Sequence, residues 1–123
     1  MLRSKLLAVV LVVVCGAVAV VGVGVASGAA KTTVTIRYTG DGFVGKVKSS
    51  KAKCVRDRTV KVYRQVGSEQ DRSVDQKLYT DTTDNEGNWD TGNSGQVHGK
   101  FYARAKRKTG CRAGTSETIR VPR

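Results

Sequence analysis

The stretch "RTVKVYRQV", residues 58–66, decides the fold class, because its apolar and charged residues alternate. One face of an extended strand would carry Val60, Val62, Arg64 and Val66, and the other face would carry Lys61 and Tyr63. A period of two is typical of a β-strand with one face in the core and one in solvent. The stretch therefore predicts a half-buried strand.

The same period continues on both sides of this strand. In "TTVTIRY", Val34, Ile36 and Tyr38 fall on one face, and in "KFYARAKRK" the alternation points Phe101, Ala103 and Ala105 inward and Tyr102, Arg104 and Lys106 outward. Further strands are predicted in "FVGKVKS", with Lys46 and Lys48 outward, and in "QKLYT", "NWD" and "ETIRV". About seven short strands without a helical stripe predict an all-β fold, an antiparallel Ig-like or transthyretin-like β-sandwich.

The segment "TTDNEGNW", residues 82–89, separates two of these strands and has two possible roles. Its Asp, Asn and Gly residues are those that a tight turn requires. A calcium loop of the EF-hand type needs glycine at its sixth position, but counting from Asp81 the sixth residue is Glu86. We therefore predict a turn, with weak calcium binding by Asp81, Asp84, Glu86 and Asp90 as the alternative.

The first thirty residues resemble a secretory signal peptide in their order of basic, apolar and small residues. Arg3 and Lys5 precede an uncharged run from Leu6 to Ala26, and "SGAA" follows it. We expect residues 1–30 to be cleaved and the protein to be secreted, extracellular or on the cell surface. The run is longer than the usual signal core of about 7 to 15 residues, so an uncleaved membrane anchor is the alternative.

Residues 31–123 make one small domain, which is marginally stable at this length unless it is cross-linked. Of three cysteines, Cys15 lies in the expected signal, which leaves Cys54 and Cys111 as a pair. Secreted proteins form disulfides, and the two cysteines and the single histidine, His98, lack the spacing of a zinc site. A disulfide between Cys54 and Cys111 is therefore predicted.

Three segments carry a resemblance to a known group of modules: "RTVKVYRQV", then "TDTTDNEGNW", then "GKFYARAK". Thr83, Asp84, Gly87 and Trp89 form the second motif, and Gly99 with Phe101 the third. Over residues 43–121 the chain resembles the carboxypeptidase-regulatory-like, Cna-B-like and transthyretin-like β-sandwich modules. The resemblance implies a secreted binding, spacer or surface-display element without catalytic residues. The last strand has no asparagine, which departs from the isopeptide-forming members.

The charge of the chain is high and unevenly distributed. The full chain has a net charge of +12, and because the first thirty residues contain two basic and no acidic residues, residues 31–123 carry +10. Residues 46–64 hold eight basic residues against one acidic residue, and residues 100–112 hold six against none. A basic surface of this kind attracts polyanions.

We predict that the domain attaches electrostatically to an anionic cell-envelope polymer or another polyanion. Tyr63 and Tyr102, interleaved with the cations, would offer rings for stacking. The alternative for the charge is a solvated surface that keeps strand edges from pairing. The alternative function is a structural spacer or surface domain without ligand, tethered to the membrane if the N-terminal segment is not cleaved. We expect a monomer in either case. The predicted binding residues are Lys46, Lys48, Lys61, Arg64, Arg104, Lys106, Arg107 and Lys108.

The sequence predicts no enzyme and no cofactor. A Ser-His-Asp arrangement would have to use His98 with Ser94 or Ser116, and neither serine lies in a nucleophile motif. Phosphate-binding glycine loops and zinc-protease motifs do not occur in the sequence. Trp89 is expected in the core as its largest side chain.

Overall fold

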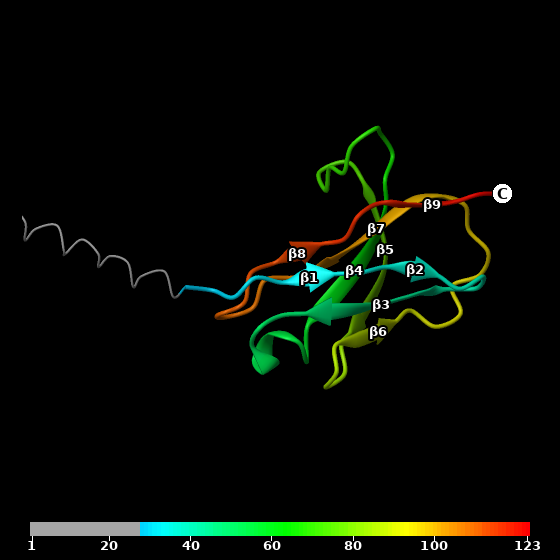
Figure 1. Ribbon diagram of the computed structural model, residues 1–123. Helices are drawn as coiled ribbons and strands as arrows, with labels where there is room; N and C mark the ends of the chain where they lie inside the picture. Colours follow the sequence, from blue (N-terminus) through cyan, green and yellow to red (C-terminus); the bar gives the residue numbers. More distant parts are fainter. Residues whose placement is uncertain (1–27) are drawn as a thin grey trace, which may run out of the picture.

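The computed structural model describes residues 28–123, so the expected signal peptide lies almost wholly outside the described residues. The described chain is all-β, with two antiparallel sheets that face each other across one core (Figure 1). Within residues 28–123 a short 3-10 helix, η1 (Ala52–Cys54), interrupts the strands. Among residues 28–123, no helix is long and apolar enough to cross a membrane.

The first sheet is built around β3, which pairs with β1 and β2 along one edge and with β6 along the other. Residues 32–38 were predicted as one strand but form two, because the chain is interrupted at Thr35 and Ile36. Both pieces keep one register against β3, with Tyr38 opposite Phe43 and Val34 opposite Val47. The strands are β1 (Thr33–Val34), β2 (Arg37–Tyr38), β3 (Phe43–Lys48) and β6 (Asn88–Asp90).

The second sheet has the order β5-β4-β7-β8. β8 pairs with the last residues of β7, and β9 pairs with its first residues. The strand predicted from residues 58–66 is β4, which lies between β5 and β7 at the centre of the sheet. A register shift between Val62 and Tyr63 leaves one extra residue on β5. The strands are β4 (Thr59–Arg64), β5 (Gln76–Thr82), β7 (Gly99–Ala105), β8 (Gly114–Thr115) and β9 (Ile119–Val121). The part of the chain that the structure describes therefore has nine short strands, where the sequence predicted about seven.

The core lies between the two sheets and confirms most of the predicted inward positions. Phe101, Ala103 and Ala105 are fully buried, and Trp89 is 2% exposed. The rings of Phe43 and Phe101, one from each sheet, approach to 4.9 Å between centroids. The buried core residues are Val34, Phe43, Val47, Val60, Val62, Trp89, Phe101, Ala103, Ala105 and Val121.

Two residues of the stretch that predicts β4 behave differently from the expectation. The strand ends at Arg64, so Val66 lies beyond it and is 59% exposed instead of buried. Arg64 does lie on the core side of β4, where its guanidinium sits 5.2 Å from the centre of the Phe101 ring. Its aliphatic stem and charge are therefore used in packing at the end of the core.

The segment 82–89 is a turn between β5 and β6, as predicted. Asp84 Oδ1 accepts hydrogen bonds from the backbone N–H groups of Glu86 and Asn88, both at 2.9 Å. These bonds, led by the one from Asn88, lower the pKa of the Asp84 carboxyl. Gly87 has a φ of +85°, and a Cβ there would lie 2.3 Å from the carbonyl oxygen of Val47. Only glycine fits this position without a shift of the backbone.

Candidate polyanion-binding site

Part of the predicted binding set converges on the outer face of the second sheet. Lys61 and Tyr63 alternate on β4, and Arg104 stands directly opposite Lys61 on β7. A shallow cleft of about 200 Å³ opens over these residues. We call it the basic cleft; its lining residues are Lys61, Tyr63, Arg72, Arg104, Lys106 and Arg107.

No acidic side chain within residues 28–123 is hydrogen-bonded to a cation of the basic cleft. Among the described residues, the single side-chain hydrogen bond that these cations make is from Arg104 Nη1 to Thr115 Oγ1, at 3.1 Å. Lys61 and Arg104 are a directly opposed cross-strand pair of like charge, an arrangement that destabilises a sheet. A bound anion would relieve this repulsion.

The two tyrosines under the basic cleft do not form the stacking platform that the sequence predicted. Tyr63 and Tyr102 do lie on the outer face, and their rings stack on each other at 5.3 Å with an interplanar angle of 13°. However, Tyr102 is fully buried and Tyr63 is 8% exposed. The loop of residues 65–75 approaches this face, and the rings are therefore the floor of the cleft and not a surface for bases or sugars.

Asp75, at the end of that loop, fixes it to the sheet. Its Oδ2 accepts hydrogen bonds from the Tyr102 hydroxyl at 2.6 Å and from the backbone N–H of Asp71 at 2.7 Å, and its Oδ1 accepts one from the N–H of Val66 at 3.0 Å. Desolvation raises the pKa of the Asp75 carboxyl, but these hydrogen bonds outweigh it and the pKa is lowered. Desolvation and the bond to Asp75 raise the pKa of Tyr102.

Arg72 belongs to the basic cleft although the sequence analysis did not select it. It lies in the loop that Asp75 anchors, and its charge acts on the Tyr102 hydroxyl. Sequence alternation assigns residues to strand faces and contains no information on where a loop folds back. The feature of the sequence that could have indicated an ordered loop is the pair Asp71 and Asp75, whose carboxylates accept hydrogen bonds from backbone N–H groups of the loop.

The other four predicted binding residues lie elsewhere. Lys46 and Lys48 are on β3, in the first sheet. Arg64 packs on Phe101 at the core side of β4. Lys108 Nζ donates to the carbonyl oxygens of Lys53 at 3.0 Å and Arg56 at 3.1 Å, so it holds η1 in place. The structure thus brings together Lys61, Arg104, Lys106 and Arg107 and separates the rest.

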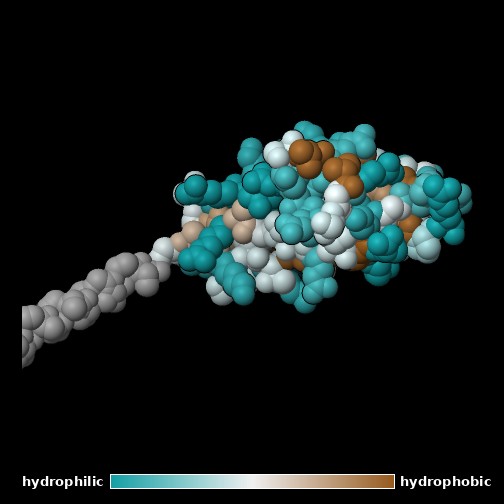
Figure 2. All heavy atoms as spheres, turned by 90° about the horizontal axis from the view of Figure 1, so that it is seen from above, coloured by the Kyte–Doolittle hydropathy of each residue, from teal (hydrophilic) through white to brown (hydrophobic). Residues whose placement is uncertain are grey.

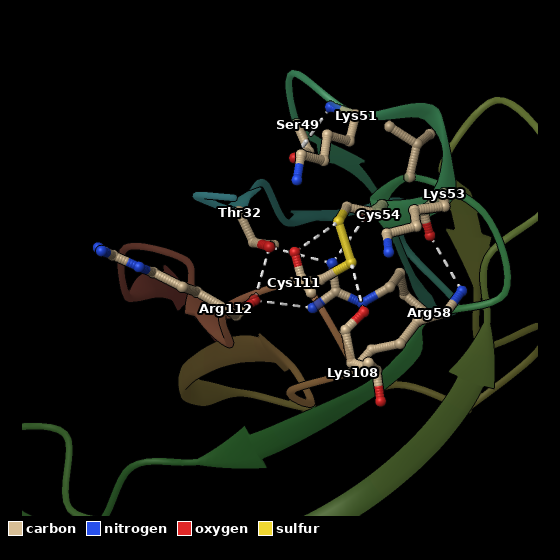
Figure 3. The surroundings of a disulfide bond; sticks show 12 residues. Thr32, Ser49, Lys51, Lys53, Cys54, Arg58, Lys108, Cys111 and Arg112 are labelled. Atoms are coloured by element: carbon tan, nitrogen blue, oxygen red, sulfur yellow. Dashed lines mark hydrogen bonds between the residues drawn. A yellow bond between two sulfur atoms is a disulfide. The ribbon is translucent and has the colours of Figure 1, made fainter. Parts of the chain in front are cut away.

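The predicted disulfide joins Cys54 of η1 to Cys111 of the β7–β8 connection, and both are fully buried (Figure 3). Next to it lies a feature that the sequence analysis missed, the guanidinium of Arg58, which is also fully buried. Arg58 Nη1 donates to Thr32 Oγ1 and to the Cys54 carbonyl, and Nη2 donates to the carbonyls of Lys106 and Arg112 (Figure 3). Burial lowers the pKa of Arg58. This one side chain ties four segments together beside the disulfide.

Two of the residues considered for catalysis or metal binding, Ser116 and Asp81, have structural roles. Ser116 Oγ accepts from the Ala103 N–H and donates to the Glu117 carbonyl, so it belongs to the edge of the second sheet. Asp81 Oδ2 accepts from the N–H of Asp90, which ties β5 to β6. Within residues 28–123, no group of three or more His, Cys, Asp or Glu side chains is placed to hold a metal ion.

No protein-family model matches the chain, and no curated protein and no solved structure matches it.

Proposed function

We propose that the chain is a secreted or cell-surface, non-catalytic module that binds an anionic polymer of the cell envelope through the basic cleft. The observation that carries the proposal is the convergence of five cations, Lys61, Arg72, Arg104, Lys106 and Arg107, around one cleft. Two of them are directly opposed across β4 and β7. An anion that enters the cleft interacts with all five at once.

The chemistry of the cleft favours phosphate groups within such a polymer. Three of the five cations are arginines, whose planar guanidinium groups bind phosphate with two parallel hydrogen bonds. The volume of about 200 Å³ suits one charged group of a polymer and not a large ligand. Polymers that carry phosphodiesters are the class that we propose, with polymers of uronic acids as the weaker competitor.

The character of the surrounding surface agrees with an electrostatic mode of attachment. Figure 2 shows that the side of the domain seen from above is mainly hydrophilic, with small separate hydrophobic areas. The large hydrophobic side chains that are strongly exposed on the described chain are Val66 and Val74. Binding to the cleft would therefore depend on charge more than on apolar contact.

The finer fold assignment is part of the same proposal. Two antiparallel sheets around one core are compatible with an Ig-like or transthyretin-like sandwich and with the Cna-B-like resemblance of residues 43–121. Modules of that kind usually bind, space or display. A disulfide at one end suits a module that works outside the cell.

Co-sedimentation with purified envelope material tests the function. The oxidised domain, residues 28–123, contains the whole described core and the disulfide. We expect it to sediment with phosphate-rich envelope polymer at low salt and to be released at about 500 mM salt, where charges are screened within about 4 Å. A variant with Lys61→Gln, Arg104→Gln and Arg107→Gln should stay in the supernatant.

The matched control changes the same number of charges outside the basic cleft. Arg37, Lys77 and Arg120 are all exposed and none of them lines it. The Arg37→Gln, Lys77→Gln, Arg120→Gln variant should bind nearly as well as the unchanged domain. If no form of the domain sediments at either salt concentration, the spacer hypothesis replaces the binding hypothesis.

A further inference from the structure

The chain enters the described fold at the end where η1 and the β7–β8 connection lie (Figure 1), the two segments that the disulfide joins. Ala30 is buried in one cluster with Cys54 and Cys111. Its N–H donates to the carbonyl of Gly110 at 3.0 Å, and its carbonyl accepts from the N–H of Arg112 at 2.8 Å. Ala30, which lies four positions after the end of the apolar run at Ala26, is therefore fixed to the body of the domain.

The same end of the domain is strongly basic. Lys53 lies at this end, because its Nζ is 2.7 Å from the position that a Cβ on Gly110 would take. Lys31 lies there too, and its carbonyl accepts a hydrogen bond from the Ser49 hydroxyl at 2.8 Å. Its acidic residues are Asp57 and, in the adjoining turn, Asp84 and Glu86. We call this surface the disulfide end; its exposed cations are Lys31, Lys48, Lys51, Lys53, Arg56 and Arg112.

The disulfide end presents these cations on a rigid base. The Cys54–Cys111 bridge joins η1 to the β7–β8 connection, and Arg58 ties both segments to Thr32 (Figure 3). Lys108 adds hydrogen bonds to the carbonyls of Lys53 and Arg56. A surface ordered in this way loses little conformational entropy when it docks.

We propose that, in the chain that retains its N-terminal segment, the disulfide end docks on the anionic lipid headgroups of the bilayer that holds residues 6–26. That uncharged run has the length of about 20 residues that a bilayer crossing requires. Three residues, Ser27, Gly28 and Ala29, separate it from the fixed Ala30. The four Cα-to-Cα steps from Ala26 to Ala30 span at most about 14 Å, less than two Debye lengths at about 0.1 M salt, so the cations lie within reach of the surface potential.

This docking does not depend on the basic cleft. Lys106 and Arg107 line the part of the basic cleft that is next to the disulfide end. None of the exposed cations of the disulfide end lines the basic cleft. The domain would lie with the disulfide end on the membrane and the cleft at its side, open to a polymer. Failure of polymer binding at the cleft would leave the docking proposal intact, and the reverse also holds.

The experiment uses the full oxidised chain in lipid nanodiscs and a gadolinium-chelate lipid, whose paramagnetic ion broadens nearby amide NMR signals. Discs of neutral phosphatidylcholine are compared with discs that contain about 30% anionic phosphatidylglycerol. The amides of Lys53 and Gly110 report on the disulfide end. Gly40 and Gly95, which contact Tyr38, report on the opposite end.

We expect the anionic lipid to increase the broadening of Lys53 and Gly110 but not that of Gly40 and Gly95, and about 500 mM salt to remove the increase. The Lys51→Gln, Lys53→Gln, Arg112→Gln variant should lose the increase, whereas Arg37→Gln, Lys77→Gln, Arg120→Gln should keep it. Equal broadening in both lipids would overturn the proposal, as would a chain that does not associate with the discs or an equal loss in both variants.

Discussion

Lys61 and Arg104 stand directly opposite each other on β4 and β7, on the outer face of the second sheet. Like charges in this position repel, and no acidic side chain among the described residues bonds to either of them. A cross-strand pair without two like charges would make the sheet more stable. The arrangement is understandable if the two cations serve to attract an anion, which is the role proposed for the basic cleft.

The first prediction concerns the energy of this pair. Lys61→Gln removes the cross-strand repulsion, so we expect the free energy of unfolding to rise by about 0.3 to 0.5 kcal/mol, while polymer binding weakens. Urea unfolding and co-sedimentation measure the two effects. Lys77→Gln is the control, because Lys77 is opposite Tyr63 and not opposite a cation. A loss of stability in Lys61→Gln would contradict the role given to the pair.

The second prediction concerns the bond between Tyr102 and Asp75. Tyr102→Phe keeps the ring on Tyr63 but removes the hydroxyl that donates to Asp75, so we expect a loss of about 1 kcal/mol at pH 7. Far-UV circular dichroism during urea unfolding provides the measurement. Asp75→Asn is expected to loosen the loop further, since it also weakens the bonds to the N–H groups of Asp71 and Val66.

The same bond predicts a pH dependence. Because the folded state lowers the pKa of Asp75 below its ordinary value of 3.8, its contribution to stability is complete above that value. The contribution is lost as the pH falls below 3.8 toward the lower folded value. The difference in stability between Tyr102→Phe and the unchanged protein should therefore shrink below about pH 4. A difference that stays constant down to pH 2 would argue against a charged partner for Tyr102.

The third prediction concerns the disulfide. Its half-cystines are 57 residues apart in sequence, and closing a loop of that length stabilises a protein by up to about 4 kcal/mol in the chain-entropy model. The Cys54→Ser, Cys111→Ser protein should unfold at a much lower urea concentration than the oxidised protein. Reducing agent should produce the same shift in the unchanged protein and none in the variant.

The fourth prediction concerns Arg58. Arg58→Lys keeps the charge, but one ammonium group cannot reach the four oxygens that the guanidinium bonds, so we expect a loss of at least about 2 kcal/mol. The combined loss of Arg58 and the disulfide should be smaller than the sum of the two separate losses, since both restrain Cys54. Strict additivity in a double-mutant cycle would contradict this coupling.

Alternation along the chain was sufficient to predict the parts of the fold that depend on period and turn chemistry. It placed Phe101, Ala103 and Ala105 inward, and the spacing of Asp84 and Gly87 predicted the turn between β5 and β6. The disulfide followed from setting Cys15 aside as part of the expected signal peptide. The split at Thr35 and Ile36 was not predicted, because the side-chain pattern continues through it without a change of register.

The tertiary environment of individual charged and aromatic residues was not predictable. Tyr102 was placed on the correct face but was expected to be exposed. It is buried because the loop anchored by Asp75 covers it. Arg58 gives no sign in the sequence that its guanidinium is buried among backbone carbonyls. Lys108 and Arg64 were selected for their charge, yet one bonds to η1 and the other packs on Phe101. The charge of a sequence indicates that polyanions are attracted to the protein. Which cations form the site depends on the side chains that the folded strands and loops bring together.

The most direct test of the central claim is the salt dependence of the affinity for phosphate-rich envelope polymer, measured for the oxidised domain and for its Lys61→Gln, Arg104→Gln variant. Counterion release makes the logarithm of the affinity fall linearly with the logarithm of the salt concentration, with a slope that drops by about one for each phosphate-binding cation removed. We predict a steep slope for the unchanged domain and a slope smaller by about two for the variant. Equal slopes for the two proteins would show that the basic cleft is not the binding site.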